Sequence, residues 1–89
     1  MEEKIKKLRE FLCKEFFVGD KFIYPSKIEI LTDHDSLIFS ANQGGYIHLI
    51  WLISELCEYN TNGSHFHIDE YTNTQKCEIP MVFGIIKEE

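Results

Sequence analysis

The segment that constrains the fold most is residues 41–60, ANQGGYIHLIWLISELCEYN. Its spacing predicts a helix, with Asn42 as the N-cap and the two glycines allowing a tight start. The glycines lack the spacing of a phosphate-binding loop, so we interpret them as part of the cap. At 100° per residue, one side of this helix collects Tyr46, Leu49, Ile50, Ile53, Leu56 and Cys57.

The opposite side of this helix is only partly polar. His48, Glu55 and Tyr59 form an expected exposed stripe, and Trp51 and Leu52 flank it. A helix that is apolar over most of its girth must be covered on two sides. A sheet can cover one side, and either an N-terminal helix or a second subunit must cover the other.

Residues 3–17 supply a candidate for that second cover. Ile5, Leu8, Leu12 and Phe16 recur at steps of three and four among charged residues, which predicts an amphipathic helix. We expect Gly19 to end it as a left-handed C-cap. Residues 1–19 would then form this helix, and residues 20–89 a ββαββ body within one domain.

Four further segments have strand character. KIEIL and LIFSA flank the polar turn TDHDS and predict a β-hairpin, and SHFHIDEY and IPMVFGIIKEE predict a second pair joined by the polar connection TNTQKCE. The expected fold is α+β, in the order α-β-β-α-β-β. We expect a four-stranded, mainly antiparallel sheet with the helices packed mainly on one face.

The charge pattern narrows the classes of partner. The chain carries −6 overall. Residues 1–19 hold five Lys/Arg against four Asp/Glu, whereas the remainder holds four lysines against eleven carboxylates. Such a body repels phosphate backbones, so we expect no nucleic-acid partner. An acidic body suits a basic protein partner, although a charge of this size also serves solubility alone.

Cysteine usage and hydropathy bear on the compartment. The three cysteines are an odd number without a CxxC pair, which is typical of free thiols in a reducing cytosol. The amphipathic start lacks the apolar core of a secretory signal, and no apolar run is long enough to span a bilayer. We therefore expect a cytoplasmic protein with no membrane partner.

The densest cluster of ligand-type side chains is NGSHFHIDEY, residues 62–71. Strand alternation puts His65, His67 and Asp69 on one face and Phe66 and Ile68 on the other. Two imidazoles and a carboxylate suit zinc or iron(II). Same-face neighbours on a strand are about 7 Å apart, so three ligands from one strand do not close a site.

A metal site there would need a carboxylate from elsewhere, such as Glu29, Glu78 or Glu88. Our prediction is therefore no bound metal and no cofactor, with a solvent-facing or partner-facing strip as the simpler interpretation. General acid–base catalysis by one of the histidines remains an alternative.

The order of these segments resembles a family of small bacterial immunity proteins from polymorphic-toxin systems. The resemblance covers roughly residues 27–87. It depends on the hairpin before the central helix, on the strand H-x-H-hydrophobic-D formed by His65, His67, Ile68 and Asp69, and on Glu78 followed by IPMVFGII. It implies a non-enzymatic inhibitor that binds a cognate toxin.

Three hypotheses follow from the sequence. The first is a protein-binding module of immunity type that occludes a basic toxin. Its candidate contacts are Trp51, Glu55, Glu58, His65, His67, Asp69 and Glu70. The second is a small metal- or histidine-dependent enzyme built on His65, His67 and Asp69. The third is a ligand-free homo-oligomer, with a homodimer formed through the central helix.

Overall fold

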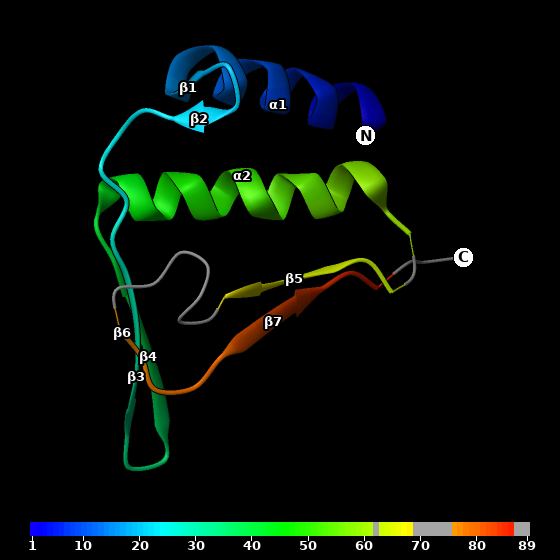
Figure 1. The fold of residues 1–89 in the computed structure, drawn as a ribbon. Coiled ribbons are helices and arrows are strands. Elements are labelled where there is room, and N and C mark those ends of the chain that lie inside the picture. The colour runs from blue at the N-terminus through cyan, green and yellow to red at the C-terminus, as the bar shows by residue number, and fades with distance from the viewer. Residues whose placement is uncertain (62, 69–75, 87–89) are drawn as a thin grey trace.

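The computed structural model describes residues 1–61, 63–68 and 76–86, and it is a small α+β domain (Figure 1). The elements in chain order are α1 (Glu2–Phe16), β1 (Phe17–Val18), β2 (Lys21–Phe22), β3 (Ile28–Asp33), β4 (Ser36–Ala41), α2 (Gln43–Tyr59), β5 (His65–Ile68), β6 (Lys76–Cys77) and β7 (Met81–Gly84).

The first helix forms as predicted, but it ends differently. Phe17 takes an extended conformation directly after α1 and starts the two-residue strand β1, which pairs antiparallel with β2. Gly19 does have a positive φ of 64°, yet it lies in the turn between these strands. The prediction that Gly19 caps the helix is therefore wrong, because the chain enters a small hairpin at Phe17.

The central helix begins as the sequence predicts. The Asn42 side chain accepts a hydrogen bond from the Gly45 N–H at 2.7 Å and another from the Lys27 N–H at 2.9 Å. A Cβ on Gly44 would overlap the carbonyl oxygen of Pro25. The glycines thus let the backbone before β3 pass close to the first turn of α2, and Asn42 satisfies amides of both segments.

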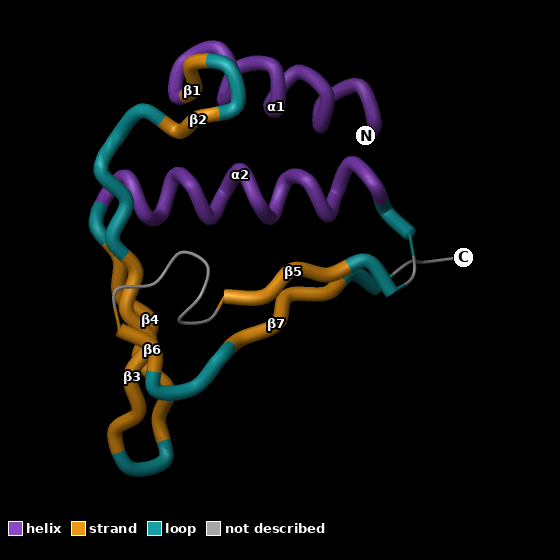
Figure 2. Tube along the Cα trace, viewed as in Figure 1, coloured by secondary structure: helices purple, strands orange, loops and turns teal. Residues whose placement is uncertain are grey.

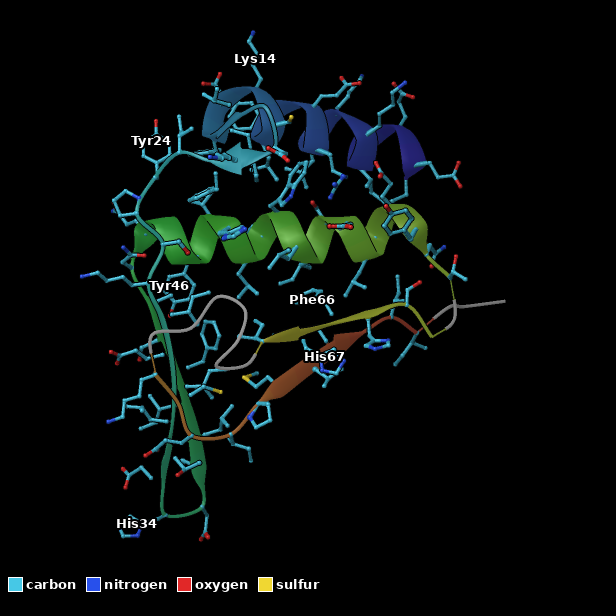
Figure 3. All side chains as sticks on the ribbon, viewed as in Figure 1. Lys14, Tyr24, His34, Tyr46, Phe66 and His67 are labelled. Carbon is cyan, nitrogen blue, oxygen red and sulfur yellow. The ribbon has the colours of Figure 1, made fainter. Side chains whose placement is uncertain are left out.

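The hairpin of β3 and β4 is confirmed. The strands pair antiparallel from Ile28↔Ala41 to Asp33↔Ser36, which leaves His34 and Asp35 as the turn. The hairpin projects away from the helices, with His34 at its tip (Figure 3). His34 has a φ of 54°, in the left-handed region that residues other than glycine seldom adopt.

The expected continuous four-stranded sheet is wrong. Within the described residues, β4, β3 and β6 form one sheet in that order, and β5 pairs antiparallel with β7 in another. β6 comes from the segment expected to be a polar connection, and it pairs parallel with β3. β6 therefore takes the place beside β3 that a strand of the second pair was expected to occupy, and β5 and β7 form a sheet of their own.

The central helix is covered on two sides, as its apolar girth requires. α1 lies against one side of α2, and the β5–β7 pair lies on the other (Figures 1 and 2). The helices are therefore successive layers rather than neighbours on one face of a sheet. The centre of the core is formed by Ile28, Ile30 and Ile68, all fully buried, where the two sheets meet.

Candidate partner-binding surface

The outward face of the β5–β7 pair carries the histidines. Phe66 and Ile68 point inward, with Phe66 stacked on Phe83 at 5.1 Å between ring centroids, whereas His65 and His67 are exposed. Figure 3 shows His67 and Phe66 on opposite sides of β5. The predicted alternation is confirmed for residues 65–68.

The two imidazoles are close neighbours. Their ring centroids lie 5.0 Å apart in an edge-to-face arrangement. His65 Nδ1 is 2.8 Å from the carbonyl oxygen of Gly63. Because a carbonyl only accepts, Nδ1 must carry the hydrogen in this contact, and Nε2 then presents its lone pair in the neutral ring. With that geometry, Nε2 of His65 has the lone pair that a hydrogen-bond acceptor or a metal ligand requires.

The third member of the motif cannot be placed. Asp69 and Glu70 lie outside the described residues, as does Glu88. Glu29 is exposed on β3, and Glu78 is held by Thr32. No group of three ligand-type side chains that could hold a metal is found in residues 1–61, 63–68 and 76–86.

A groove of about 190 Å³ lies between α2 and β5. Glu55 from the helix and His65 from the strand both line it. The other lining residues are mainly apolar or aromatic: Leu52, Leu56, Tyr59, Ser64 and Phe66. The fold thus brings two of the predicted contact residues, Glu55 and His65, to one depression that combines a carboxylate with apolar walls.

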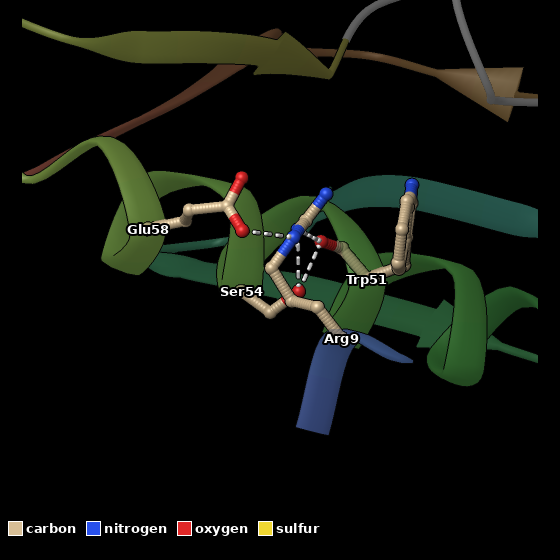
Figure 4. Close-up of polar contacts among 4 residues, drawn as sticks. All are labelled: Arg9, Trp51, Ser54 and Glu58. Atoms are coloured by element: carbon tan, nitrogen blue, oxygen red, sulfur yellow. Dashed lines mark hydrogen bonds and ion pairs between the residues drawn. The ribbon is translucent and has the colours of Figure 1, made fainter. Parts of the chain in front are cut away.

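Trp51 and Glu58 are engaged within the chain. Arg9 of α1 lies over the Trp51 ring, and its Nε is 3.3 Å from the Glu58 carboxylate (Figure 4). Its Nη1 donates to Ser54 Oγ at 2.8 Å and to the Trp51 carbonyl at 3.2 Å. Trp51 therefore lies beneath the first helix, between Arg9 and Phe17.

Arg9 is the intramolecular partner of Trp51 and Glu58 that sequence reasoning missed. It is the only arginine in the chain, and it stands one turn from both Ile5 and Leu12 on the apolar face of α1. A lone arginine on an apolar helix face was the available signal, because guanidinium groups pair and stack when partly buried.

His48 was expected to be exposed, and this is wrong. It is partly buried and stacked on Phe22, with ring centroids 4.9 Å apart and planes 8° apart. Burial lowers the pKa of His48 below its usual value, because the charged ring loses hydration. Within the described residues, His48 Nδ1 has no hydrogen-bond partner. The hairpin of β1 and β2, which sequence reasoning did not predict, supplies this aromatic cover.

Glu78 links the corner after β6 to β3. Its carboxylate accepts from the Thr32 N–H at 2.6 Å and from Thr32 Oγ1 at 3.2 Å. The backbone hydrogen bond from Thr32 is the main cause that lowers the pKa of Glu78, and Lys76 adds to it. Glu78 therefore has a clear structural role, which accounts for its place at the head of the closing hydrophobic run.

Comparison with known proteins gives no match: no protein-family profile, no curated protein and no solved structure is similar to this chain. Neither helix in the described part of the chain has the length and hydropathy needed to cross a bilayer.

Proposed function

We propose that this chain is a non-enzymatic protein-binding module of immunity type, which occludes a basic bacterial toxin. The observation that carries the proposal is the groove between α2 and β5, where Glu55 stands beside apolar walls and His65. The resemblance of residues 27–87 to immunity proteins supports the same function.

The groove suits a lysine or arginine side chain from the partner. Such a side chain has an aliphatic stem, which packs on Leu52, Leu56 and Phe66, and a cationic end, which pairs with Glu55. Anchors of this kind, seated in a pocket and surrounded by weaker contacts, carry most of the energy of protein interfaces. His65 borders the groove, whereas His67 and the exposed Val82 lie on the outward face of β5–β7, on the other side of the strand pair.

Charge favours the same side of the molecule. The basic residues are concentrated in α1, whereas the part of the chain after Asp20 carries most of the carboxylates. α1 lies on the far side of α2 from β5 and β7 (Figure 1). A basic partner is therefore steered toward the sheets and away from α1.

The test is inhibition of, and binding to, the toxin encoded beside this gene. Glu55→Gln should weaken binding by about tenfold, because the partner's cation loses its counter-charge in a partly desolvated site. Glu15→Gln, which removes one exposed carboxylate from α1, is the matched control and should leave affinity within about twofold. A gene neighbourhood without a toxin, or equal affinities for both variants, would contradict the proposal.

A second candidate is a metal- or histidine-dependent enzyme, which the edge-to-face pair of His65 and His67 favours. Metal analysis of the purified protein decides it. Stoichiometric metal that is lost in His67→Ala would support this candidate against the binding module. Metal-free protein with unchanged toxin binding in His67→Ala would remove it.

A further inference from the structure

The outer edge of β4 offers a row of backbone hydrogen-bonding groups. In an antiparallel pair, alternate residues direct their N–H and C=O toward the partner strand and away from it. The Ile30 carbonyl accepts from the Glu78 N–H on the β6 side, so the backbone N–H and C=O of Ile30 are directed away from β4. The backbone groups of its register partner Phe39, and with them those of Leu37 and Ala41, must then be directed away from β3.

Among the described residues, none of the features that usually protect an edge strand is found at β4. β4 has the sequence SLIFSA, without a charge, a proline or a glycine, and its register with β3 contains no bulge. Within the described residues, no strand pairs with its outer side. Leu37 and Ile38, on opposite faces of the strand, are 44 % and 40 % exposed. Soluble proteins usually blunt such edges, because an apolar uncharged edge strand pairs with other chains.

The chain also exposes more surface than a monomer of its mass should. Its accessible area is 6761 Å², whereas the usual area–mass relation gives about 5,400 Å² for 10.5 kDa. Its radius of gyration is 14.1 Å, against about 12 Å for a compact domain of this length. The excess of about 1,300 Å² exceeds the roughly 800 Å² that one partner buries in a standard interface.

We propose that β4 pairs antiparallel with β4 of a second copy of this chain, about a two-fold axis at Phe39. In this register Phe39 faces Phe39 of the second copy, and Leu37 faces Ala41. All three residues are the outward-pointing ones, so each facing pair exchanges both of its backbone hydrogen bonds. The two β4-β3-β6 sheets then become one continuous sheet.

The charge distribution leaves β4 as a place where two copies can meet. The body is acidic, and two copies repel each other over most of their surface. β4 is an uncharged stretch where they can approach. Antiparallel pairing also sends the two hairpin tips, which carry Asp33 and Asp35, to opposite ends of the new ladder. Parallel pairing would set the tips side by side, and it has no two-fold symmetry about an axis across the strands.

The oligomeric state of the full chain tests this interface. Leu37→Pro removes one outward N–H and places a ring on the edge, without touching a hydrogen bond to β3. Leu37→Thr is its matched control, since it removes the same apolar side chain but keeps the N–H and strand preference. We expect a dimer by light scattering for the wild type and for Leu37→Thr, and a dissociation constant at least about tenfold higher for Leu37→Pro.

Two further measurements keep the test decisive if Leu37→Pro folds poorly. Ile38→Lys, which adds a charge to the edge and keeps every backbone group, should also dissociate the dimer. In hydrogen exchange, the amides of Leu37, Phe39 and Ala41 should gain protection with rising concentration, while those of Ile38 and Ser40 stay protected throughout. A wild type that is monomeric at all concentrations, or a dimer that both edge variants leave intact, would overturn the proposal. So would edge amides that gain protection only when a toxin is added.

Discussion

The guanidinium carbon of Arg9 lies 3.9 Å from the centroid of the Trp51 ring, and this contact joins the two helices. The same side chain binds Ser54, the Trp51 carbonyl and Glu58, so one residue of α1 contacts about two turns of α2. Only 12 % of the Arg9 side chain is exposed. Arg9 is thus a largely buried charge with several partners, so its removal should destabilise the fold.

Arg9→Ala should lower the free energy of unfolding by about 2–3 kcal/mol, because it removes a cation–π contact and charged hydrogen bonds and leaves Ser54 uncovered. Urea denaturation followed by Trp51 fluorescence measures this. Lys14→Ala is the control: Lys14 is exposed and points away from α2 (Figure 3), so its loss should cost little. Equal stability of the two variants would mean that α1 is held by its apolar side chains alone.

His34→Gly should raise the free energy of unfolding by about 0.5–1 kcal/mol. His34 has a φ of 54°, where a side chain is strained and glycine is not. Asp35 is the control, because it lies in the same turn but does not have a positive φ. Among the described residues other than glycine, only His34 and Asn60 do. Asp35→Gly should therefore bring no gain. Thermal denaturation of both variants measures the difference, and a loss of stability in His34→Gly would show that its imidazole has a role at the tip.

Local patterns were enough to predict much of this fold. The Asn42 cap, the hairpin of β3 and β4 and the alternation of His65 to Ile68 all depend on neighbours in sequence, and all are present. The two-sided cover of α2 was also expected from its apolar girth, although the sequence left open whether α1 or a second subunit supplies the second side.

Apart from the Gly19 cap, which the local hairpin of β1 and β2 replaces, the errors concern contacts between residues far apart in the chain. β6 is two residues long, too short for any periodicity, and it is held by Glu78 reaching Thr32 across 46 positions. That pairing divides the expected sheet. The same holds for the site: alternation predicted that His65 is exposed, but its place on the same groove as Glu55 depends on how β5 lies against α2. Arg9 and Trp51, 42 positions apart, are a further example.

The stability of the chain should fall as pH drops through the range set by His48. Burial against Phe22 lowers the pKa of His48 from 6.5, so the unfolded chain takes up a proton before the folded chain does. The free energy of unfolding therefore decreases below about pH 6.5, until the folded form is protonated as well. His48→Phe keeps the ring stack and removes the titrating group and the unpaired Nδ1. Its stability should be flatter with pH in this window, and an unchanged profile would contradict the assignment.

At lower pH, protonation of Glu78 should cause a further decrease in the free energy of unfolding. The Thr32 N–H, then Thr32 Oγ1 and Lys76, lower the pKa of Glu78 from 4.5. A carboxylate with a lowered folded pKa stabilises the protein above its unfolded value, and that contribution disappears as pH falls through the folded value. Glu78→Gln should therefore reduce the slope of stability against pH below about 4.5. Glu29→Gln, at an exposed site on β3, is the control and should keep the wild-type slope. If both variants keep the wild-type slope, the charge of the Glu78 carboxylate does not stabilise the fold. The pairing of β6 with β3 would then depend on backbone hydrogen bonds alone.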